Sequence, residues 1–236
     1  KAGAAVIAIM DPYGNDAAVA ALARAGVTAF AMEFMPRITR AQVMDVLSSQ
    51  ANLAGYQAVI DAASEYDRAL PMMMTAAGTV AAAKVFVMGA GVAGLQAIAT
   101  ARRLGGVVSA TDVRPASKEQ VASLGAIQNF GGFIGAAVGP IITGAVLAAT
   151  GSFTGVFVIG VEDDEFKAAE TAAGYAKPMS AEYQAKQAEL VASHIVKQDI
   201  VVTTALIPGR PAPVLVTEAM VKSMRPGSVV VDLAVT

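Results

Sequence analysis

Residues 84–100 read KVFVMGAGVAGLQAIAT. A short apolar run rich in β-branched residues enters a Gly-x-Gly-x-x-Gly turn, and an Ala-rich helical pattern follows it. This is the order that a dinucleotide-binding βαβ unit requires. Gly89 permits the tight turn, Gly91 lets the backbone approach a pyrophosphate, and Gly94 lets the helix pack closely on the strand. The first N–H groups of such a helix point at the phosphates.

A second apolar run supports this interpretation, because a glycine pattern alone arises by chance in a chain rich in Ala and Gly. Residues 106–111 read GVVSAT and are followed by Asp112, about 20 residues after the glycine turn, as the fingerprint expects. A carboxylate there accepts a hydrogen bond from the ribose 2′-OH and repels a 2′-phosphate, which favours NAD. Arg114 keeps the alternative open, since arginine can hold that phosphate.

Composition narrows the possible chemistry. The 236 residues carry a net charge of −2, which gives no electrostatic case for a nucleic-acid partner. There is no Cys and one His, so a thiol nucleophile, a disulfide, a His-based metal site and a Ser/His/Asp triad are all disfavoured. We expect no metal, and we expect His194 to be an ordinary surface or cap residue.

Strand-like and helical patterns alternate along the rest of the chain, which predicts an α/β fold with a mostly parallel sheet. We expect Met72, Met73 and Met74 to be adaptable packing. The expected strands are residues 4–10, 27–32, 156–161, 199–205 and 229–234, and the expected helices are 16–24, about 44–71, 115–124 and 181–196. The abrupt start at Lys1, without Met, and the equally abrupt end suggest a piece of a longer polypeptide.

Four further stretches resemble a known family. They are RITRAQ at 37–42, DVLSSQANLAGY at 45–56, MMMTAAGT at 72–79 and TALIPGRPAP at 204–213. They are similar to the NAD(H)-binding domain I of the alpha subunit of proton-translocating NAD(P) transhydrogenase. The resemblance implies two Rossmann-like lobes of the alanine dehydrogenase type: a doubly wound parallel sheet and the remnant of a second lobe. It implies a first-lobe remnant at 1–45, a connecting helix at 46–75 and an NAD-binding lobe at 76–236.

In that family, hydride passes directly between NADH on domain I and NADP(H) on a partner domain III, coupled to proton movement through a membrane domain II. The resemblance therefore implies an NAD(H)-binding component of an enzyme, a homodimer, placed peripherally on the cytoplasmic side of a bacterial inner membrane. Hydride transfer needs no protein nucleophile, so the protein must hold two nicotinamides at reactive distance and exclude water.

The resemblance also implies roles for particular residues. Arg37, Asp45 and Ser48 would orient the nicotinamide carboxamide, which needs both donors and acceptors, and Gln42 would reach toward the partner nucleotide. Alternatively, Arg37 and Asp45 form only a surface ion pair. The implied NAD contacts are Arg37, Ile38, Thr39, Gln42, Val43, Met44 and Asp45 near the nicotinamide; Gly89, Ala90, Gly91, Val92 and Gly94 at the pyrophosphate; Asp112, Val113 and Arg114 at the adenosine ribose; and Gly174, Tyr175, Gln187 and Leu206 as further contacts, of which Gly174 and Tyr175 match a mobile loop.

One segment departs from the family pattern. Residues 127–155 are uncharged, apolar and rich in small residues, and they resemble a transmembrane helix of a major-facilitator-type transporter. One crossing would separate the glycine turn from the strand at 199–205, and two crossings need roughly 40 residues, so a folded lobe excludes a span. We expect an excursion from the sheet edge, with 156–161 resuming the strand. The alternatives are a chimeric, inactive nucleotide-binding fragment and an alanine-dehydrogenase-like NAD oxidoreductase.

Overall fold

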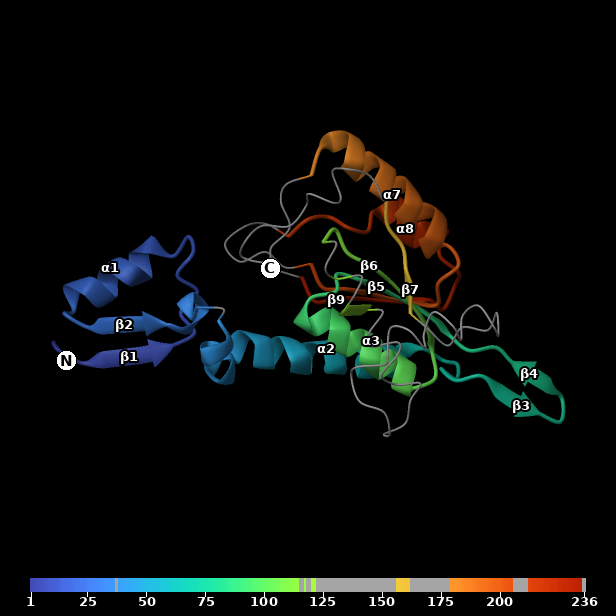
Figure 1. The fold of residues 1–236 in the computed structure, drawn as a ribbon, viewed down its shortest axis with the longest axis horizontal. Helices are drawn as coiled ribbons and strands as arrows, with labels where there is room; N and C mark the ends of the chain where they lie inside the picture. The colour runs from blue at the N-terminus through green and yellow to red at the C-terminus, as the bar shows by residue number, and fades with distance from the viewer. Residues whose placement is uncertain are drawn as a thin grey trace.

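The computed structural model describes residues 1–36, 38–114, 117, 120–121, 156–161, 179–205 and 212–234. These form an α/β fold built on a parallel sheet with the strand order β7-β6-β5-β8-β9, together with two smaller sheets (Figure 1). The elements are β1 (Ala5–Ala8), α1 (Asp16–Arg24), β2 (Thr28–Ala31), the 3₁₀ helices η1 (Met32–Phe34) and η2 (Thr39–Met44), α2 (Val46–Glu65), β3 (Met73–Thr75), β4 (Gly78–Val80), β5 (Lys84–Met88), α3 (Val92–Arg103), β6 (Val107–Thr111), β7 (Phe157–Val158), α7 (Ala181–Ile195), β8 (Ile200–Thr203), α8 (Glu218–Ser223) and β9 (Val229–Asp232).

The glycine-turn unit lies at the centre of the main sheet. Strand β5 pairs in parallel with β6 on one side and with β8 on the other. The predicted resumption of a strand at 156–161 is confirmed, because Phe157 and Val158 pair in parallel with Ser109 and Ala110 of β6. Residues 127–155 lie outside the described part of the chain. Among the residues that are described, no helix is long and apolar enough to cross a membrane.

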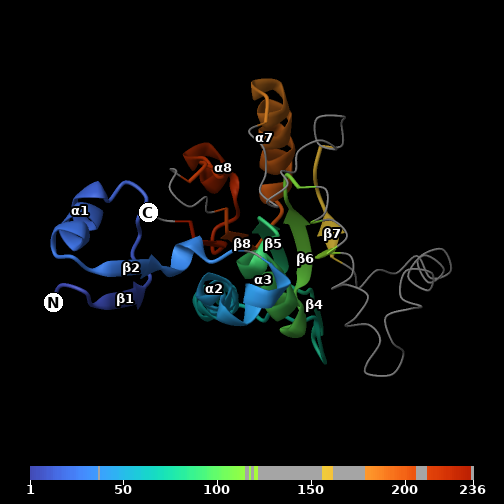
Figure 2. The ribbon, with the colours of Figure 1, turned by 60° about the vertical axis from the view of Figure 1, so that its left-hand side comes forward.

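Each face of the main sheet has its own apolar core, because successive side chains of a strand point to opposite faces. Val85 and Val87 of β5 join the core beneath α2 and α3. Phe86 and Met88 of the same strand join the core beneath α7 and α8. Figure 2 shows the two pairs of helices on opposite sides of the strands. The strands are buried on both faces, which explains why they read as continuous apolar runs.

Helix α2 crosses α3 at very short range. A Cβ added to Gly55 would lie 2.0 Å from the carbonyl oxygen of Ala93, so only glycine allows this approach. Nearby, Asn52 donates to the side chain of Gln96 across the same crossing, at 3.2 Å. The predicted helix at 44–71 is therefore correct in position but too long at its C-terminal end. It stops at Glu65 because Tyr66 turns into the core with an extended backbone.

The first lobe remnant is a small parallel unit. Strands β1 and β2 pair side by side, and α1 connects them, as the alternating pattern predicted. It lies at one end of the molecule and is joined to α2 through η1 and η2 (Figure 1). None of the residues of β1, α1 or β2 is buried, in contrast to β5 and β8 of the main sheet.

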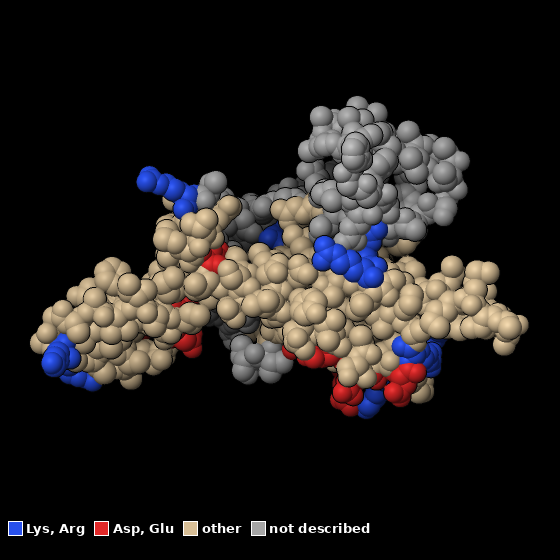
Figure 3. Space-filling model, turned by 90° about the horizontal axis from the view of Figure 1, so that it is seen from below, with Lys and Arg blue, Asp and Glu red and all other residues tan. Residues whose placement is uncertain are grey.

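The hairpin formed by β3 and β4 projects from the opposite end of the molecule (Figure 1). Its side chains include Met72, Met73 and Met74, which are 63%, 43% and 83% exposed. The prediction that these methionines pack inside the chain is therefore wrong. Their position on a two-stranded ribbon leaves both faces without a layer of described residues to cover them. On the face drawn in Figure 3, the described residues at this projecting tip include no charged side chain.

Candidate functional site

The turn between β5 and α3 has a geometry that depends on two glycines. Gly89 has a φ of +101°, and its N–H donates to the carbonyl of Thr111 at 2.8 Å. A Cβ on Gly94 would lie 1.8 Å from the carbonyl oxygen of Gly89. The first turn of α3 is thereby held directly against the end of β5. Thr204, at the end of β8, donates its hydroxyl to the carbonyl of Gly89 at 3.1 Å, a contact that no sequence pattern had identified.

The backbone at Gly91 is open. The only atom within 4 Å of a Cβ built on Gly91, among the described residues, is a guanidinium nitrogen of Arg114 at 3.9 Å. Gly91 is also the residue that precedes α3, so the unpaired N–H groups of the first helical turn begin here. An open helix N-terminus of this kind fits a diphosphate. The residues present therefore fit a dinucleotide cofactor.

Asp112 is tied to this turn by its carboxylate. Oδ2 accepts from the backbone N–H of Ala90 at 2.6 Å and from Nη2 of Arg114 at 2.9 Å. Oδ1 accepts from the backbone N–H and from Nε of Arg114, at 2.8 and 3.0 Å. Burial by itself raises the pKa of Asp112, but the hydrogen bonds and the charge of Arg114, together with the Ala90 N–H, lower the pKa below its usual value. The group is a buried, ionised acceptor.

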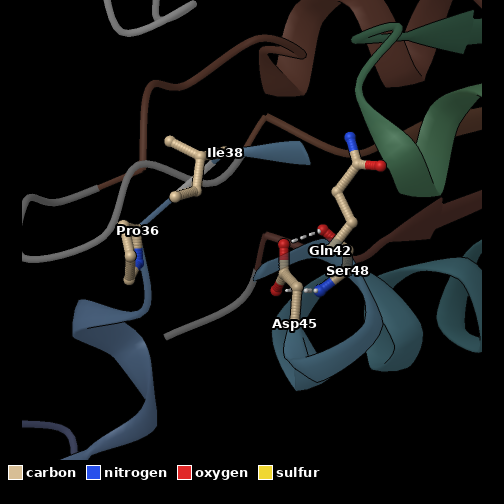
Figure 4. Close-up of a pocket in the computed structure, with 5 residues that line it drawn as sticks. All are labelled: Pro36, Ile38, Gln42, Asp45 and Ser48. Atoms are coloured by element: carbon tan, nitrogen blue, oxygen red, sulfur yellow. Dashed lines mark hydrogen bonds between the residues drawn. The ribbon is translucent and has the colours of Figure 1, made fainter. Parts of the chain in front are cut away.

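A second cluster lies where η2 meets α2 (Figure 4). Asp45 is the N-cap of α2: its carboxylate accepts from the Ser48 backbone N–H at 3.0 Å and from the Ser48 hydroxyl at 2.6 Å. Pro36, Ile38, Gln42, Asp45 and Ser48 line a hollow of about 470 Å³, which includes open solvent. Ligand pockets typically measure about 300–1,000 Å³. The amide of Gln42 extends away from the Asp45–Ser48 cap (Figure 4).

The structure thus gathers the expected site residues into two groups. Ile38, Gln42, Asp45 and Ser48 line the hollow, and Pro36 joins them although no sequence signal had selected it. Ala90 and Asp112 are bonded to each other at the glycine turn. The close crossing of α2 and α3 at Gly55 and Ala93 links the two groups.

The remaining expected contacts are more scattered. Val43 and Met44 are exposed, and Gln187 is half-buried on α7. Arg37, Gly174, Tyr175 and Leu206 lie outside the described residues, as does the side chain of Thr39. Pairing of Arg37 with Asp45 therefore stays a prediction.

The prediction that His194 is a surface or cap residue is wrong. Its ring contacts Phe86 edge to face, and Nε2 lies 2.9 Å from both the Ser109 hydroxyl and the Gln198 amide. Burial, followed by the charges of Lys197 and Lys84, lowers the pKa of His194. The half-buried ring therefore joins α7 to β5 and β6, and its last-turn position in α7 had suggested only a cap.

These features define a class of protein. In the order β7-β6-β5-β8-β9, the chain reverses direction across the sheet between β5 and β8, and the glycine turn lies at the carboxyl end of β5. That is the ligand position of a Rossmann-type nucleotide-binding fold.

The chain belongs to the alanine dehydrogenase/PNT family. The C-terminal domain of that family matches residues 58–236, and its N-terminal domain matches residues 1–54. Similarity to individual proteins agrees with this assignment. In Rhodospirillum rubrum, the first of the proteins that make up NAD(P) transhydrogenase subunit alpha is 56% identical over 235 residues, covering 100% of this chain and 53% of that protein. The chain is 43% identical to NAD(P) transhydrogenase subunit alpha of Haemophilus influenzae, covering 99% of this chain and 40% of the relative.

Solved structures give the same result. The crystal structure of transhydrogenase from Sinorhizobium meliloti superposes with a TM-score of 0.77 at 65% identity, covering 99% of this chain and 54% of that one. An L-alanine dehydrogenase structure superposes with a TM-score of 0.62 at 20% identity, covering 98% of this chain and 50% of that one, which shows the fold alone. The chain spans about half the length of the transhydrogenase subunits that it matches. It is homologous to a component of transhydrogenase, a protein whose name as a subunit implies partners.

Proposed function

We propose that this chain is the NAD(H)-binding component of a proton-translocating transhydrogenase and positions NADH for direct hydride transfer to NADP⁺ on a partner domain. The observation that carries the proposal is the open backbone at Gly91, in front of the first turn of α3. Bound NADH would supply the hydride; the chain would supply position. The half-length match means that the reaction itself belongs to a larger assembly.

Each group of residues has a defined task in this proposal. The glycine turn and the start of α3 hold the diphosphate through backbone N–H groups. Asp112 accepts from the adenosine ribose and disfavours a 2′-phosphate, which selects NAD(H) over NADP(H). At the other end, Asp45, Ser48 and Arg37 orient the carboxamide. Gln42, whose amide extends away from the helix cap, reaches toward the partner nucleotide.

The proposed assembly follows the family. A partner domain III carries NADP(H), and a membrane domain II conducts protons, so the chain would lie peripherally on the cytoplasmic side of a bacterial inner membrane. We propose residues 1–45 as the first-lobe remnant, 46–75 as the connection and 76–236 as the NAD-binding lobe. Two copies would associate through the apolar hairpin of β3 and β4, whose methionines are exposed.

Isothermal titration tests the cofactor assignment. We expect NADH to bind and NADPH to bind at least tenfold more weakly, because a 2′-phosphate would lie beside the Asp112 carboxylate. Tight NADPH binding without NADH binding would overturn the assignment, and binding of neither would favour the inactive-fragment alternative. Mixing the chain with a separately prepared, NADP-loaded domain III and following hydride exchange by absorbance tests the reaction.

A substitution in the hairpin tests the dimer. Met74, which is 83% exposed, can be changed to Lys without disturbing the core of the chain. We expect sedimentation to show a dimer for the unsubstituted chain and a monomer for Met74→Lys, since a charge would be buried at the contact. An unchanged sedimentation coefficient would place the dimer contact elsewhere.

A further inference from the structure

The carboxylate of Asp112 has no spare acceptor position in this structure. An ionised carboxylate offers about four lone-pair sites. The Ala90 N–H takes one, and Arg114 takes the other three through its backbone N–H, Nε and Nη2, at 2.8, 3.0 and 2.9 Å. The Asp112 side chain is only 9% exposed, so water has little access to it. A ribose hydroxyl can bond to Asp112 only if one of these donors leaves.

Arg114 is the donor that can leave. The Ala90 N–H belongs to the turn that follows β5 and cannot move without disturbing the sheet. The guanidinium, by contrast, ends a side chain that is 24% exposed. Its Nη2 also lies 3.9 Å from the position of a Cβ on Gly91. One nitrogen therefore stands beside both the carboxylate and the open backbone in front of α3.

The space around the carboxylate supports the same conclusion. The hollow beside Asp112, lined by residues that include Ala90, Thr111 and Val158, measures about 150 Å³. That is below the range of about 300–1,000 Å³ for ligand pockets. The ribose end of the site is closed, whereas the hollow at Gln42, Asp45 and Ser48 measures about 470 Å³.

We infer that Arg114 is a built-in competitor for the ribose position: nucleotide binding exchanges the guanidinium of Arg114 for ribose hydroxyls on Asp112, and the released guanidinium turns to the diphosphate beside Gly91. This inference rests on the proposed function and adds a positioning role to it. Hydrogen bonds are exchanged, and no covalent bond changes. The exchange makes binding of the adenosine portion depend on the presence of phosphates, because only a diphosphate gives the displaced arginine a new partner.

Two ligands separate this role from simple support of the site. Adenosine has the ribose but no phosphate, whereas ADP has both. In Arg114→Ala, we expect adenosine to bind about fivefold more tightly, because its competitor is gone, and ADP to bind about tenfold more weakly, because its phosphate partner is gone. In Arg114→Lys, which keeps the charge but not the planar fork, adenosine gains affinity and ADP stays within about threefold of the unsubstituted chain.

The matched control is Arg103→Ala, which removes an exposed positive charge from the far end of α3. We expect it to leave both affinities within about twofold, since exposed charges at that distance are screened. Near-ultraviolet circular dichroism and the midpoint of urea unfolding establish that each variant is folded.

The unsubstituted chain gives a test that needs no variant. Raising the salt concentration weakens the Asp112–Arg114 pair, so adenosine affinity should rise while ADP affinity falls. The inference is overturned if adenosine binds equally or more weakly in folded Arg114→Ala, or if both ligands lose affinity with salt. If the unsubstituted chain binds neither ADP nor NADH, the proposed function fails and the inference fails with it. ADP binding without the adenosine gain refutes the inference alone.

Discussion

The carboxyl ends of β1 and β2 use the same device as those of β5 and β6. In the first lobe, Glu33 follows β2 and accepts from the backbone N–H groups of Met10 and Asp11, at 2.7 and 2.6 Å, in the turn after β1. In the second lobe, Asp112 follows β6 and accepts from Ala90 in the turn after β5. A carboxylate after one parallel strand thus fixes the turn after its neighbour in both lobes.

The two ends differ in what surrounds the carboxylate. The first turn contains Asp11, a non-glycine residue with a φ of +45°, and α1 begins only at Asp16. The second has Gly89 at the positive φ, an open Gly91, and a helix that begins at once. Oε2 of Glu33 is buried without a hydrogen-bond partner among the described residues, whereas Asp112 is held by Arg114. A carboxylate in this position therefore stabilises a turn, and only the glycines make the turn a nucleotide site.

The largest effect is expected from Gly94→Ala, which removes the distinction between the two turns. A Cβ at Gly94 would meet the Gly89 carbonyl at 1.8 Å, and backbone cannot yield as a side chain can. We expect a loss of more than about 3 kcal/mol in the free energy of unfolding, measured by urea denaturation, together with loss of NADH binding. The control is Gly14→Ala in the first lobe, where φ is +73° and no described atom lies within 4 Å. Only about 1 kcal/mol should be lost there.

Asp112→Asn should have the next largest effect. The amide cannot accept all the hydrogen bonds from Ala90 and Arg114, and the guanidinium loses its counter-charge. We expect a loss of about 2–3 kcal/mol in unfolding free energy and at least tenfold weaker NADH binding by titration. NADH binding within twofold of the unsubstituted chain would remove Asp112 from the site.

Glu33→Gln tests the same device in the first lobe, where we expect a smaller loss of about 1 kcal/mol. Burial raises the pKa of Glu33, but its own backbone N–H and those of Asp11 and Met10 lower it below the ordinary 4.5. A lowered pKa contributes stability that is present above pH 4.5 and is lost as the pH falls through the folded value. Urea midpoints across acid pH should therefore fall less steeply in the variant. An unchanged acid profile would show that the Glu33 bonds contribute nothing.

The smallest expected effect concerns His194, which joins α7 to the sheet near neither turn. Its pKa is lowered from 6.5 by burial, Lys197 and Lys84. Below pH 6.5 the unfolded chain takes up a proton that the folded chain resists, so stability should fall until the pH passes the folded value. His194→Gln should remove this slope, since the chain contains one His. A slope that survives in the variant would assign it to another group.

The sequence predicted the main sheet because its strands are buried on both faces and therefore read as uninterrupted apolar runs next to glycine turns. It predicted the glycine turn because Gly89 and Gly94 have no substitute at those backbone positions. It could not predict that the methionines of the hairpin are exposed, since apolar character does not specify what covers a side chain. The capping role of Asp45 was accessible, because an Asp before a helical pattern is a known start signal. The three hydrogen bonds from Arg114 to Asp112 were not, because they depend on how one side chain folds back.

The most direct test of the account is titration of Gly91→Ala with NADH. A methyl group at this position would meet, among the described residues, only Arg114, at 3.9 Å, and the backbone φ of −74° suits alanine. The variant should therefore unfold at the same urea concentration as the unsubstituted chain, while the methyl group occupies the space in front of α3. The account predicts unchanged stability and at least tenfold weaker NADH binding. Equal NADH binding by both proteins would contradict the claim that the turn between β5 and α3 holds the nucleotide.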